Sequence, residues 1–454
     1  MLMQCSAVGR RLCLVFFLSV MSVIGYAGEL EHVQQKKANA PAIYGNTGWT
    51  DEGLNTLISD PDYRDPVSGE LGLHRFLMSN PCQQRRGNIE QASCADLRVL
   101  VLFVDFSDRR VEDAEEKFQA FQTYLDFLTP AAQWLQQSSF GQLQLRFVAP
   151  QRDRQLNWIR LSRAATDYVV NREDHLRFAY VREIAQAAYD RYQIRVDDYD
   201  TVLIMPVKGS AGLPNGPATI SAHYVGESRF PAEVAYVDQQ GKAHGLDHFI
   251  TAGNDLFRWG PLWFVHELGH LFGLPDTYLY ETKIRGQEVN RFFYVGGWDM
   301  MGNIGGHSPD FFGWHKLKLR WLSDQQVITV ANTVRHSIHQ LTPVETPDGV
   351  KLVVIPTGLR TAYVAELRSG AGVNAWPSIH RTDLPDTARR GVLIYRIDAG
   401  TWLSTDTPVA QVISRAYYHS AMVGKGENKT GFWRALDNSA DAQLGGALWQ
   451  EGDV

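Results

Sequence analysis

The sequence has little cysteine, no extended basic runs and almost no long hydrophobic segments, and each shortage excludes a class of protein. Four cysteines in 454 residues are too few for a scaffold held together by disulfides. Lysine and arginine never cluster beyond pairs, and 44 of them stand against 50 acidic residues, for a net charge of -6. Because a nucleic-acid-binding protein needs a basic surface to neutralise phosphates, no nucleic acid is expected as a partner.

The one long apolar run lies at the N-terminus. Two arginines precede residues 12–24, and Gly25-Tyr26-Ala27 closes the run with small residues at its outer positions. This order is typical of a secretory signal peptide, here residues 1–27. The alternative is a membrane anchor, but the run is shorter than the roughly 20 residues that span a bilayer, and no stop-transfer charges follow. We therefore expect a secreted protein with no stable membrane anchor.

Residues 28–95 are polar, rich in turn-forming residues and poorly periodic. Two interpretations stay open: a pro-segment that folds back on the same chain, or a loosely structured N-terminal layer of the main domain. Cys82 and Cys94 lie in this stretch, and export to an oxidising compartment favours a small loop disulfide between them.

The hydrophobic pattern downstream predicts two further regions. Strand-like segments lie at residues 97–106, 142–148 and 201–207, with a short edge strand at 219–225. Helix-like segments lie between them at 111–128, 131–137 and 176–192, and Pro130 is expected to end the first of these helices. That order predicts an α/β (α+β) domain, which we assign to residues 96–322. From residue 323 to 454 the pattern changes to short β segments, at 326–330, 350–355, 362–367 and 391–397, which predict a β-rich C-terminal region.

The chemistry is concentrated in one helix-like segment that begins near Pro261 and ends near Gly273. His266 and His270 are four residues apart, so their imidazoles stand one turn apart on the same face. That spacing lets two nitrogens reach one zinc ion at about 2.0–2.1 Å. Glu267 projects beside them and suits the general base that acts on the metal's water.

A third ligand is expected where the chain turns back after the helix. Asp276 comes ten residues after the first histidine, and its carboxylate is the preferred candidate. Asp299, in the glycine-rich stretch 296–306, is the alternative. Three protein ligands leave the fourth zinc position to water, which distinguishes a catalytic site from a structural one.

These motifs resemble the M6 family of secreted bacterial metallopeptidases, the immune inhibitor A type. Residues 266–276, followed by Gly297-Trp298-Asp299-Met300-Met301, carry the resemblance, and residues 308–322 are similar to the family's next helix. Weaker similarity extends from residue 97 to residue 398. The resemblance implies a metzincin-like, zincin-type catalytic domain, zinc as cofactor, protein or peptide substrates, and Met301 as the methionine beneath the site.

The sequence thus predicts a secreted zinc-dependent endopeptidase with Glu267 as general base and His266, His270 and Asp276 as metal ligands. Extended substrate would pair with the edge strand at 219–225. Two alternatives stay open: a secreted binding or adhesion protein whose zinc is structural, and a zinc hydrolase that acts on substrates other than protein.

Overall fold

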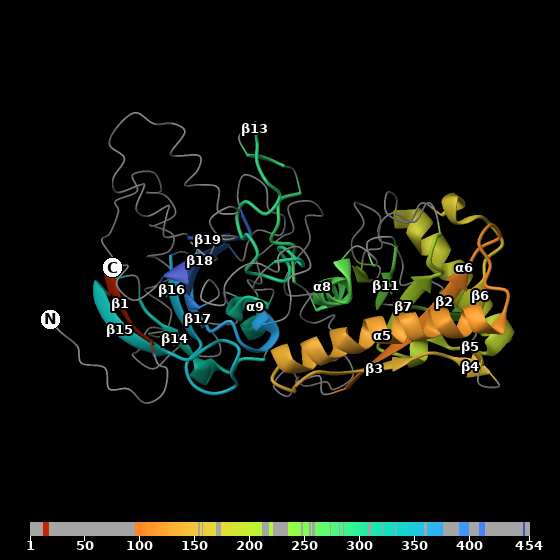
Figure 1. Ribbon diagram of the computed structural model, residues 1–454, viewed down its shortest axis with the longest axis horizontal. Coiled ribbons are helices and arrows are strands. Elements are labelled where there is room, and N and C mark those ends of the chain that lie inside the picture. Colours follow the sequence, from red (N-terminus) through yellow and green to blue (C-terminus); the bar gives the residue numbers. More distant parts are fainter. Residues whose placement is uncertain are drawn as a thin grey trace. The chain divides into compact units, whose positions relative to one another are not determined.

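In the computed structural model the chain forms two compact units (Figure 1). The parallel-sheet unit is Asp62–Pro275, and the C-terminal unit is Met1–Pro61 with Asp276–Val454. This division falls inside the range 96–322 that the sequence predicts as one domain. The structure describes residues 12–17, 96–152, 155–156, 158–168, 174–210, 218–220, 235–246, 248–253, 256, 259–272, 274–280, 282–284, 286–306, 310–319, 321–331, 333–357, 361–375, 390–398, 408–413 and 448–449.

The parallel-sheet unit is built on a six-stranded sheet with the order β3-β2-β7-β11-β8, to which β6 adds by pairing with β2. The strands are β2 (Asp96–Asp105), β3 (Gln144–Val148), β6 (Trp158–Arg160), β7 (Thr201–Pro206), β8 (Ala218–Ile220) and β11 (His248–Thr251). All neighbours are parallel except β8, which runs antiparallel to β11 at the edge. The unbroken apolar runs of β2 and β7 fit strands buried on both faces, and the α/β class and these two strands are confirmed.

In the described part of this unit, the helices α5 (Ala114–Ser138), α6 (Asp174–Tyr192) and α8 (Leu262–Leu271) accompany the sheet. The prediction of α6 is confirmed, but the prediction of two helices separated at Pro130 is wrong, because α5 runs straight through that proline. An internal proline costs about 3 kcal/mol. The cost is offset by a buried stripe that continues on both sides of it, made of Leu128, Ala131, Trp134 and Leu135.

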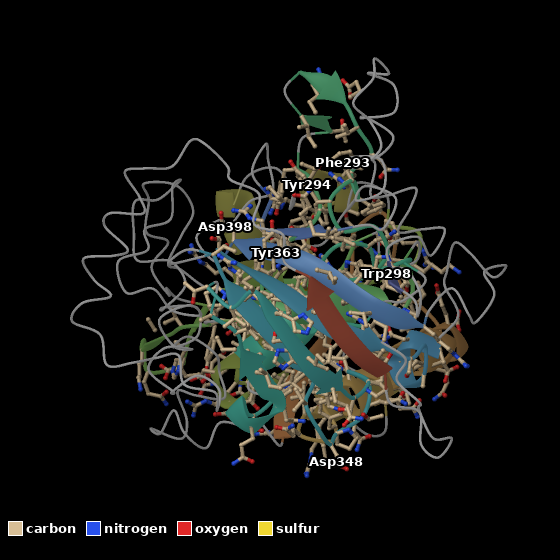
Figure 2. All side chains as sticks on the ribbon, turned by 90° about the vertical axis from the view of Figure 1, so that its left-hand side faces the viewer. Phe293, Tyr294, Trp298, Asp348, Tyr363 and Asp398 are labelled. Carbon is tan, nitrogen blue, oxygen red and sulfur yellow. The ribbon has the colours of Figure 1, made fainter. Side chains whose placement is uncertain are left out.

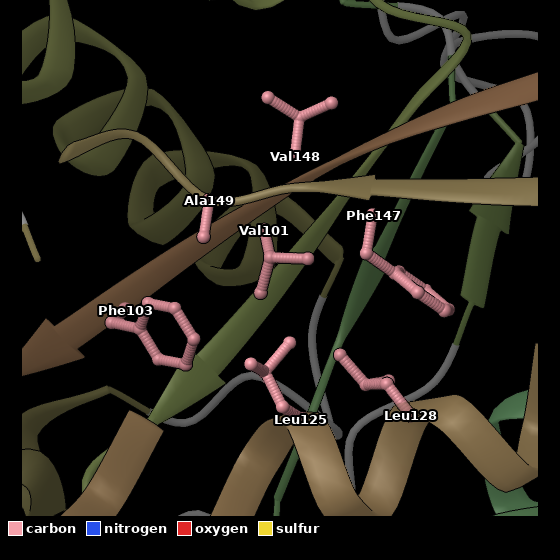
Figure 3. Close-up of a pocket in the computed structure, with 7 residues that line it drawn as sticks. All are labelled: Val101, Phe103, Leu125, Leu128, Phe147, Val148 and Ala149. Carbon is pink, nitrogen blue, oxygen red and sulfur yellow. The ribbon is translucent and has the colours of Figure 1, made fainter. Parts of the chain in front are cut away.

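An apolar pocket of about 260 Å³ lies between β2, β3 and α5 (Figure 3). Its lining residues are Val101, Phe103, Leu125, Leu128, Phe147, Val148 and Ala149. None of these side chains titrates or ligates, so this wall of the sheet supports packing rather than chemistry. Phe147 contacts Phe264 of α8 edge-on, with ring centroids 5.5 Å apart, which fastens α8 to the sheet.

The C-terminal unit contains a second six-stranded sheet with the order β14-β16-β17-β18-β19, with β20 also paired to β18. Its strands are β14 (Val327–Thr329), β16 (Leu352–Pro356), β17 (Thr361–Arg368), β18 (Gly391–Asp398), β19 (Ala410–Val412) and β20 (Leu448–Trp449). The β segments predicted for this region are confirmed. Figure 2 shows this sheet with Tyr363 of β17 and Asp398 of β18 labelled.

Side chains of the second sheet alternate between two covered faces. One face carries an apolar cluster that includes Val353, Ala365 and Leu341. The other face lies against the helix α9 (Gly313–Lys318), since a Cβ added to Gly313 would meet Leu352 and Glu366 at 2.4 and 2.7 Å. The second face therefore holds the start of α9 in close contact with β16 and β17.

Lys351 carries a buried positive charge on the loop before β16. Its Nζ donates to the hydroxyls of Thr342 and Thr346, both at 2.8 Å, and to the carbonyls of Pro343 and Asp348 at 2.9 and 2.6 Å. Burial lowers the pKa of Lys351 to about 8. Four oxygens satisfy the ammonium group, and the turn that carries Asp348 is labelled in Figure 2.

The remaining elements are short. Strand β1 (Leu12–Phe17) pairs antiparallel with β15 (His336–Leu341). The other two-stranded pairs are β4 (Gln151–Arg152) with β5 (Gln155–Leu156), β9 (Tyr236–Val237) with β10 (Ala243–His244), and β12 (Lys283–Ile284) with β13 (Gln287–Glu288). The described residues also form the 3₁₀ helices η2 (Ala165–Asp167), η3 (Val196–Asp198), η4 (Asp324–Gln326) and η5 (Gly372–Ala375). Among the described residues, no helix combines the length and the hydropathy that crossing a membrane would need.

Strand β1 falls in the segment expected to be a signal peptide, so its pairing describes the chain before any cleavage, and the signal peptide stays a prediction. Residues 18–95 lie outside the described residues, and with them Cys82, Cys94 and the choice between a pro-segment and an N-terminal layer of the main domain.

Candidate metal centre

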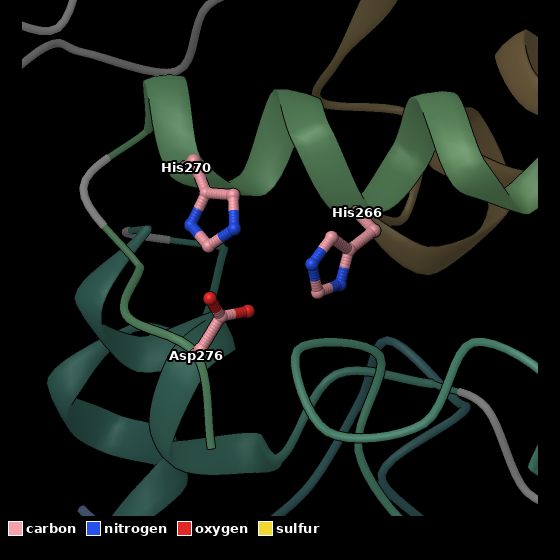
Figure 4. Close-up of side chains that lie close together, drawn as sticks. All are labelled: His266, His270 and Asp276. Carbon is pink, nitrogen blue, oxygen red and sulfur yellow. The ribbon is translucent and has the colours of Figure 1, made fainter. Parts of the chain in front are cut away.

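The two histidines lie on α8, one turn apart, as their spacing predicts. Pro261 is the N-cap of this helix, which starts at Leu262, close to the predicted start. All of its residues except His270 are buried, because its aromatic and aliphatic side chains pack within the unit. The imidazoles of His266 and His270 meet nearly at right angles, with ring centroids 4.8 Å apart. The two rings thus converge on one region of space (Figure 4).

The chain leaves α8 through a turn that fixes the second imidazole. Leu274 donates its backbone N–H to the Gly269 carbonyl at 3.0 Å, and its own carbonyl lies 2.9 Å from Nδ1 of His270. Because a carbonyl can only accept, Nδ1 of His270 holds the ring proton and Nε2 keeps its lone pair. Metal-binding histidines are oriented in this way by a carbonyl or carboxylate on the second nitrogen.

Asp276 completes the group. One ligand atom from each of His266, His270 and Asp276 lies within 4.8 Å of the others, and Figure 4 shows the three side chains turned toward one another. Donor atoms around a tetrahedral zinc ion at about 2.0–2.1 Å are about 3.3 Å apart, so small side-chain movements close the triangle. Two imidazoles and a carboxylate are donors that zinc accepts, and the residues present therefore fit this metal.

The carboxylate of Asp276 is held from outside the group by Tyr280. The Tyr280 hydroxyl donates to Oδ2 of Asp276 at 2.6 Å, and its ring stacks on that of Tyr278 with centroids 5.6 Å apart. Asp276 is 4% exposed whereas Tyr280 is 49% exposed, so the phenol links a buried carboxylate to the surface. Sequence reasoning does not single out Tyr280, although its position four residues after a candidate ligand is a usable signal.

Glu267 follows His266 on α8 and is 9% exposed. Successive helical residues are rotated by about 100°, so its side chain leaves the helix beside the row of the two histidines rather than within it. That placement is the one expected of a residue acting next to the metal instead of binding it.

The structure places Asp299 in a different set of contacts. Its Oδ2 accepts from the Thr277 hydroxyl at 2.8 Å, and its Oδ1 accepts from the Phe312 backbone N–H at 2.9 Å and from Nδ1 of His315 at 3.1 Å. Burial by itself would raise the pKa of Asp299, but His315 and these hydrogen bonds outweigh it and hold the pKa below its usual range.

Met301 lies in the same turn and is fully buried. The backbone N–H groups of Gly302 and Asn303 both donate to the Asp299 carbonyl at 3.0 Å, which closes the turn. The Met301 carbonyl accepts from the Thr277 N–H at 3.0 Å, so the methionine lies against the residue that follows Asp276. Its role beneath the imidazoles stays a prediction.

The edge strand expected to receive substrate is described over Ala218–Ile220, where it forms β8, packed against α8. Residues 221–225 lie outside the described residues. No protein-family model matches the chain, and no curated protein does.

Proposed function

We propose that the chain is a secreted, zinc-dependent endopeptidase of the metzincin-like M6 type. The observation that carries the proposal is the convergence of His266, His270 and Asp276, with the second imidazole already in the tautomer that offers Nε2. The motif supplies Glu267 beside these ligands, and the apolar start of the chain supplies the expected export signal.

Each residue has one role in this proposal. His266, His270 and Asp276 hold the zinc ion, which when bound lowers the pKa of water and polarises the carbonyl of the scissile peptide. Glu267 accepts the proton of the attacking water at its carboxylate and passes it to the leaving amine nitrogen. Among the described strands, β8 is the edge strand beyond β11, and in this proposal its backbone groups pair with an extended peptide and orient the bond to be cut.

The proposal is tested by replacing Glu267 with Gln, which keeps the shape and removes the base. We expect cleavage of a peptide library to fall by at least about 100-fold while bound zinc stays at one ion per chain. The matched control is Glu288→Gln, at a carboxylate whose side chain is 70% exposed, which should cleave as the unaltered chain does. Persisting cleavage in Glu267→Gln removes Glu267 as the base, and loss of zinc makes it a ligand.

Chelation separates the catalytic proposal from its two alternatives. A catalytic zinc ion is required for peptide cleavage, so removing it abolishes cleavage, and adding zinc restores it. If the zinc ion is structural and the chain is a binding protein, chelation lowers the melting temperature, and the unaltered chain cleaves no peptide in the first place. A zinc hydrolase of other substrates binds the ion and leaves every peptide of the library intact.

A further inference from the structure

Thr277, the residue directly after Asp276, is fastened through both its main chain and its side chain. Its N–H donates to the Met301 carbonyl at 3.0 Å, and its hydroxyl donates to Oδ2 of Asp299 at 2.8 Å. Thr277 and Asp299 are both 0% exposed, so water does not compete for these bonds. Two bonds on the neighbouring residue restrict where the backbone of Asp276 can lie.

Asp299 is itself anchored on its other oxygen. Oδ1 accepts from Phe312, the residue that caps α9, and from His315 within that helix. The carbonyl of the preceding residue, Trp298, accepts from the Arg368 guanidinium of β17 at 3.2 Å. The carboxylate is thus fixed to a helix and, through its neighbour, to a sheet, and it can serve as a rigid support for Thr277.

The fit around Thr277 is close enough to exclude a larger neighbour. A Cβ added to Gly302 would lie 2.9 Å from Oγ1 of Thr277 and 2.4 Å from Cγ2 of Val295. The turn that follows Asp299 therefore closes directly onto the threonine hydroxyl. Such a dedicated enclosure is expected where one hydroxyl must keep one position.

We propose that Asp299 is a positioning residue for the metal centre, which holds the ligand Asp276 in place through Thr277 and is not itself the third ligand. The inference rests on the proposed function, since it takes the group around His266 as a zinc site. A ligand whose backbone is held beforehand loses less freedom when the metal binds. Removing such support typically weakens metal binding about 10–100-fold.

The direct test compares Thr277→Val with Thr277→Ser. Valine keeps the shape but cannot donate to Asp299, whereas serine keeps the hydroxyl. We expect the valine variant to bind zinc about 10–100-fold more weakly, measured by competition with a chromophoric chelator, and the serine variant to restore most of that loss. Peptide cleavage by the valine variant should recover when zinc is raised to saturation, because the defect lies in ligand placement; a general packing defect would not recover.

Two controls keep the test decisive. Thr357→Val makes the same change at an exposed threonine, whose hydroxyl donates to Thr361 at 2.9 Å, and should leave zinc affinity unchanged. Asp299→Asn is compared with Asp276→Asn, because a true third ligand loses more zinc affinity than a positioning residue. If Thr277→Val fails to fold, this comparison decides alone.

The outcomes separate this inference from the proposed function. An unaltered chain that binds zinc but cleaves no peptide overturns the peptidase, while the variants still judge the positioning role by zinc affinity. The positioning role alone is overturned if Thr277→Val binds zinc with unchanged affinity. It is also overturned if Asp299→Asn loses more zinc affinity than Asp276→Asn does. A chain that binds no zinc at all overturns both.

Discussion

Replacing Arg368 with Met removes the charge that compensates a buried carboxylate. Arg368 is fully buried on β17, where its Nε donates to Glu366 at 2.6 Å and its terminal nitrogen to the carbonyls of Trp298 and Phe311 at 3.2 and 3.3 Å. Glu366 also accepts from Gly313 N–H at 2.6 Å and from the hydroxyl of Tyr395 at 2.9 Å. Methionine fills similar space and satisfies none of these acceptors.

The expected loss is large because the remaining charge stays buried. Breaking a buried ion pair on one side costs about 3–5 kcal/mol in unfolding free energy, and each orphaned carbonyl adds to that. The double variant Glu366→Gln/Arg368→Met removes both charges, while the glutamine oxygen still accepts from Gly313 and Tyr395. It should recover about 1–3 kcal/mol relative to the single variant.

The loss should also depend on pH in a direction that the structure fixes. Burial raises the pKa of Glu366 above its ordinary value, and Arg368 opposes that rise. When the pKa of an acidic group is higher in the folded state than in the unfolded state, the protein loses stability as pH increases from the unfolded pKa through the folded pKa. Removing the guanidinium raises the pKa further, so Arg368→Met should be less destabilised at about pH 5 than at about pH 8.

Denaturant unfolding at several pH values measures these differences. The matched control is Arg396→Met on β18, where the side chain is 33% exposed and its carboxylate partner Asp398 lies 3.9 Å away. We expect less than about 1 kcal/mol there. An Arg368→Met loss as small as that of the control, or one that grows toward acid pH, would refute the assignment of a compensating buried charge.

Three further predictions concern other parts of the chain. Hydrogen bonds from His244 to Asp238 and Asp197 raise the pKa of His244. The unaltered chain should therefore have a larger free energy of unfolding than His244→Gln at about pH 6, and this difference should shrink as pH rises through the raised pKa. A difference that grows toward alkaline pH would contradict this. Pro130→Ala should raise the unfolding free energy by about 1–3 kcal/mol, since it restores a helical N–H; calorimetry showing a loss would mean that the ring's packing matters more. Tyr280→Phe should weaken zinc binding about 10-fold in chelator competition, whereas an unchanged affinity would show that the phenol does not orient Asp276.

The elements that the sequence predicts well are those with an unbroken local pattern. Strands β2 and β7 are built on continuous apolar runs, at residues 99–104 and 202–206, and β17 and β18 begin and end within a residue or two of the predicted bounds. Helix α5 fails the same local reasoning, because only the packing of residues on both sides of Pro130 decides whether the helix continues. The local sequence reveals the energetic cost of a proline inside a helix, but it does not reveal the tertiary contacts that offset this cost.

The candidate site divides in the same way. The spacing of His266 and His270 fixes their common helix face, and their distance from Asp276 suggests that the chain returns to them. The partners of Asp299 lie 13 and 16 residues away on α9 and its cap, and 22 residues back at Thr277. No spacing rule links a carboxylate to partners at such distances along the chain. From the sequence, Asp299 therefore stays an alternative third ligand, whereas in the structure its carboxylate bonds with Thr277, Phe312 and His315.

Lys351 gives the C-terminal unit a cation that is covalently part of the chain and cannot dissociate from it. Its ammonium occupies a cage of two hydroxyls and two carbonyls, the same kind of oxygen shell that an extracellular domain often fills with a dissolved ion. Because the ammonium group belongs to the chain, it holds the oxygens of the turn around Asp348 in place without a dissolved ion. Dialysis against a chelator should therefore leave that turn in place.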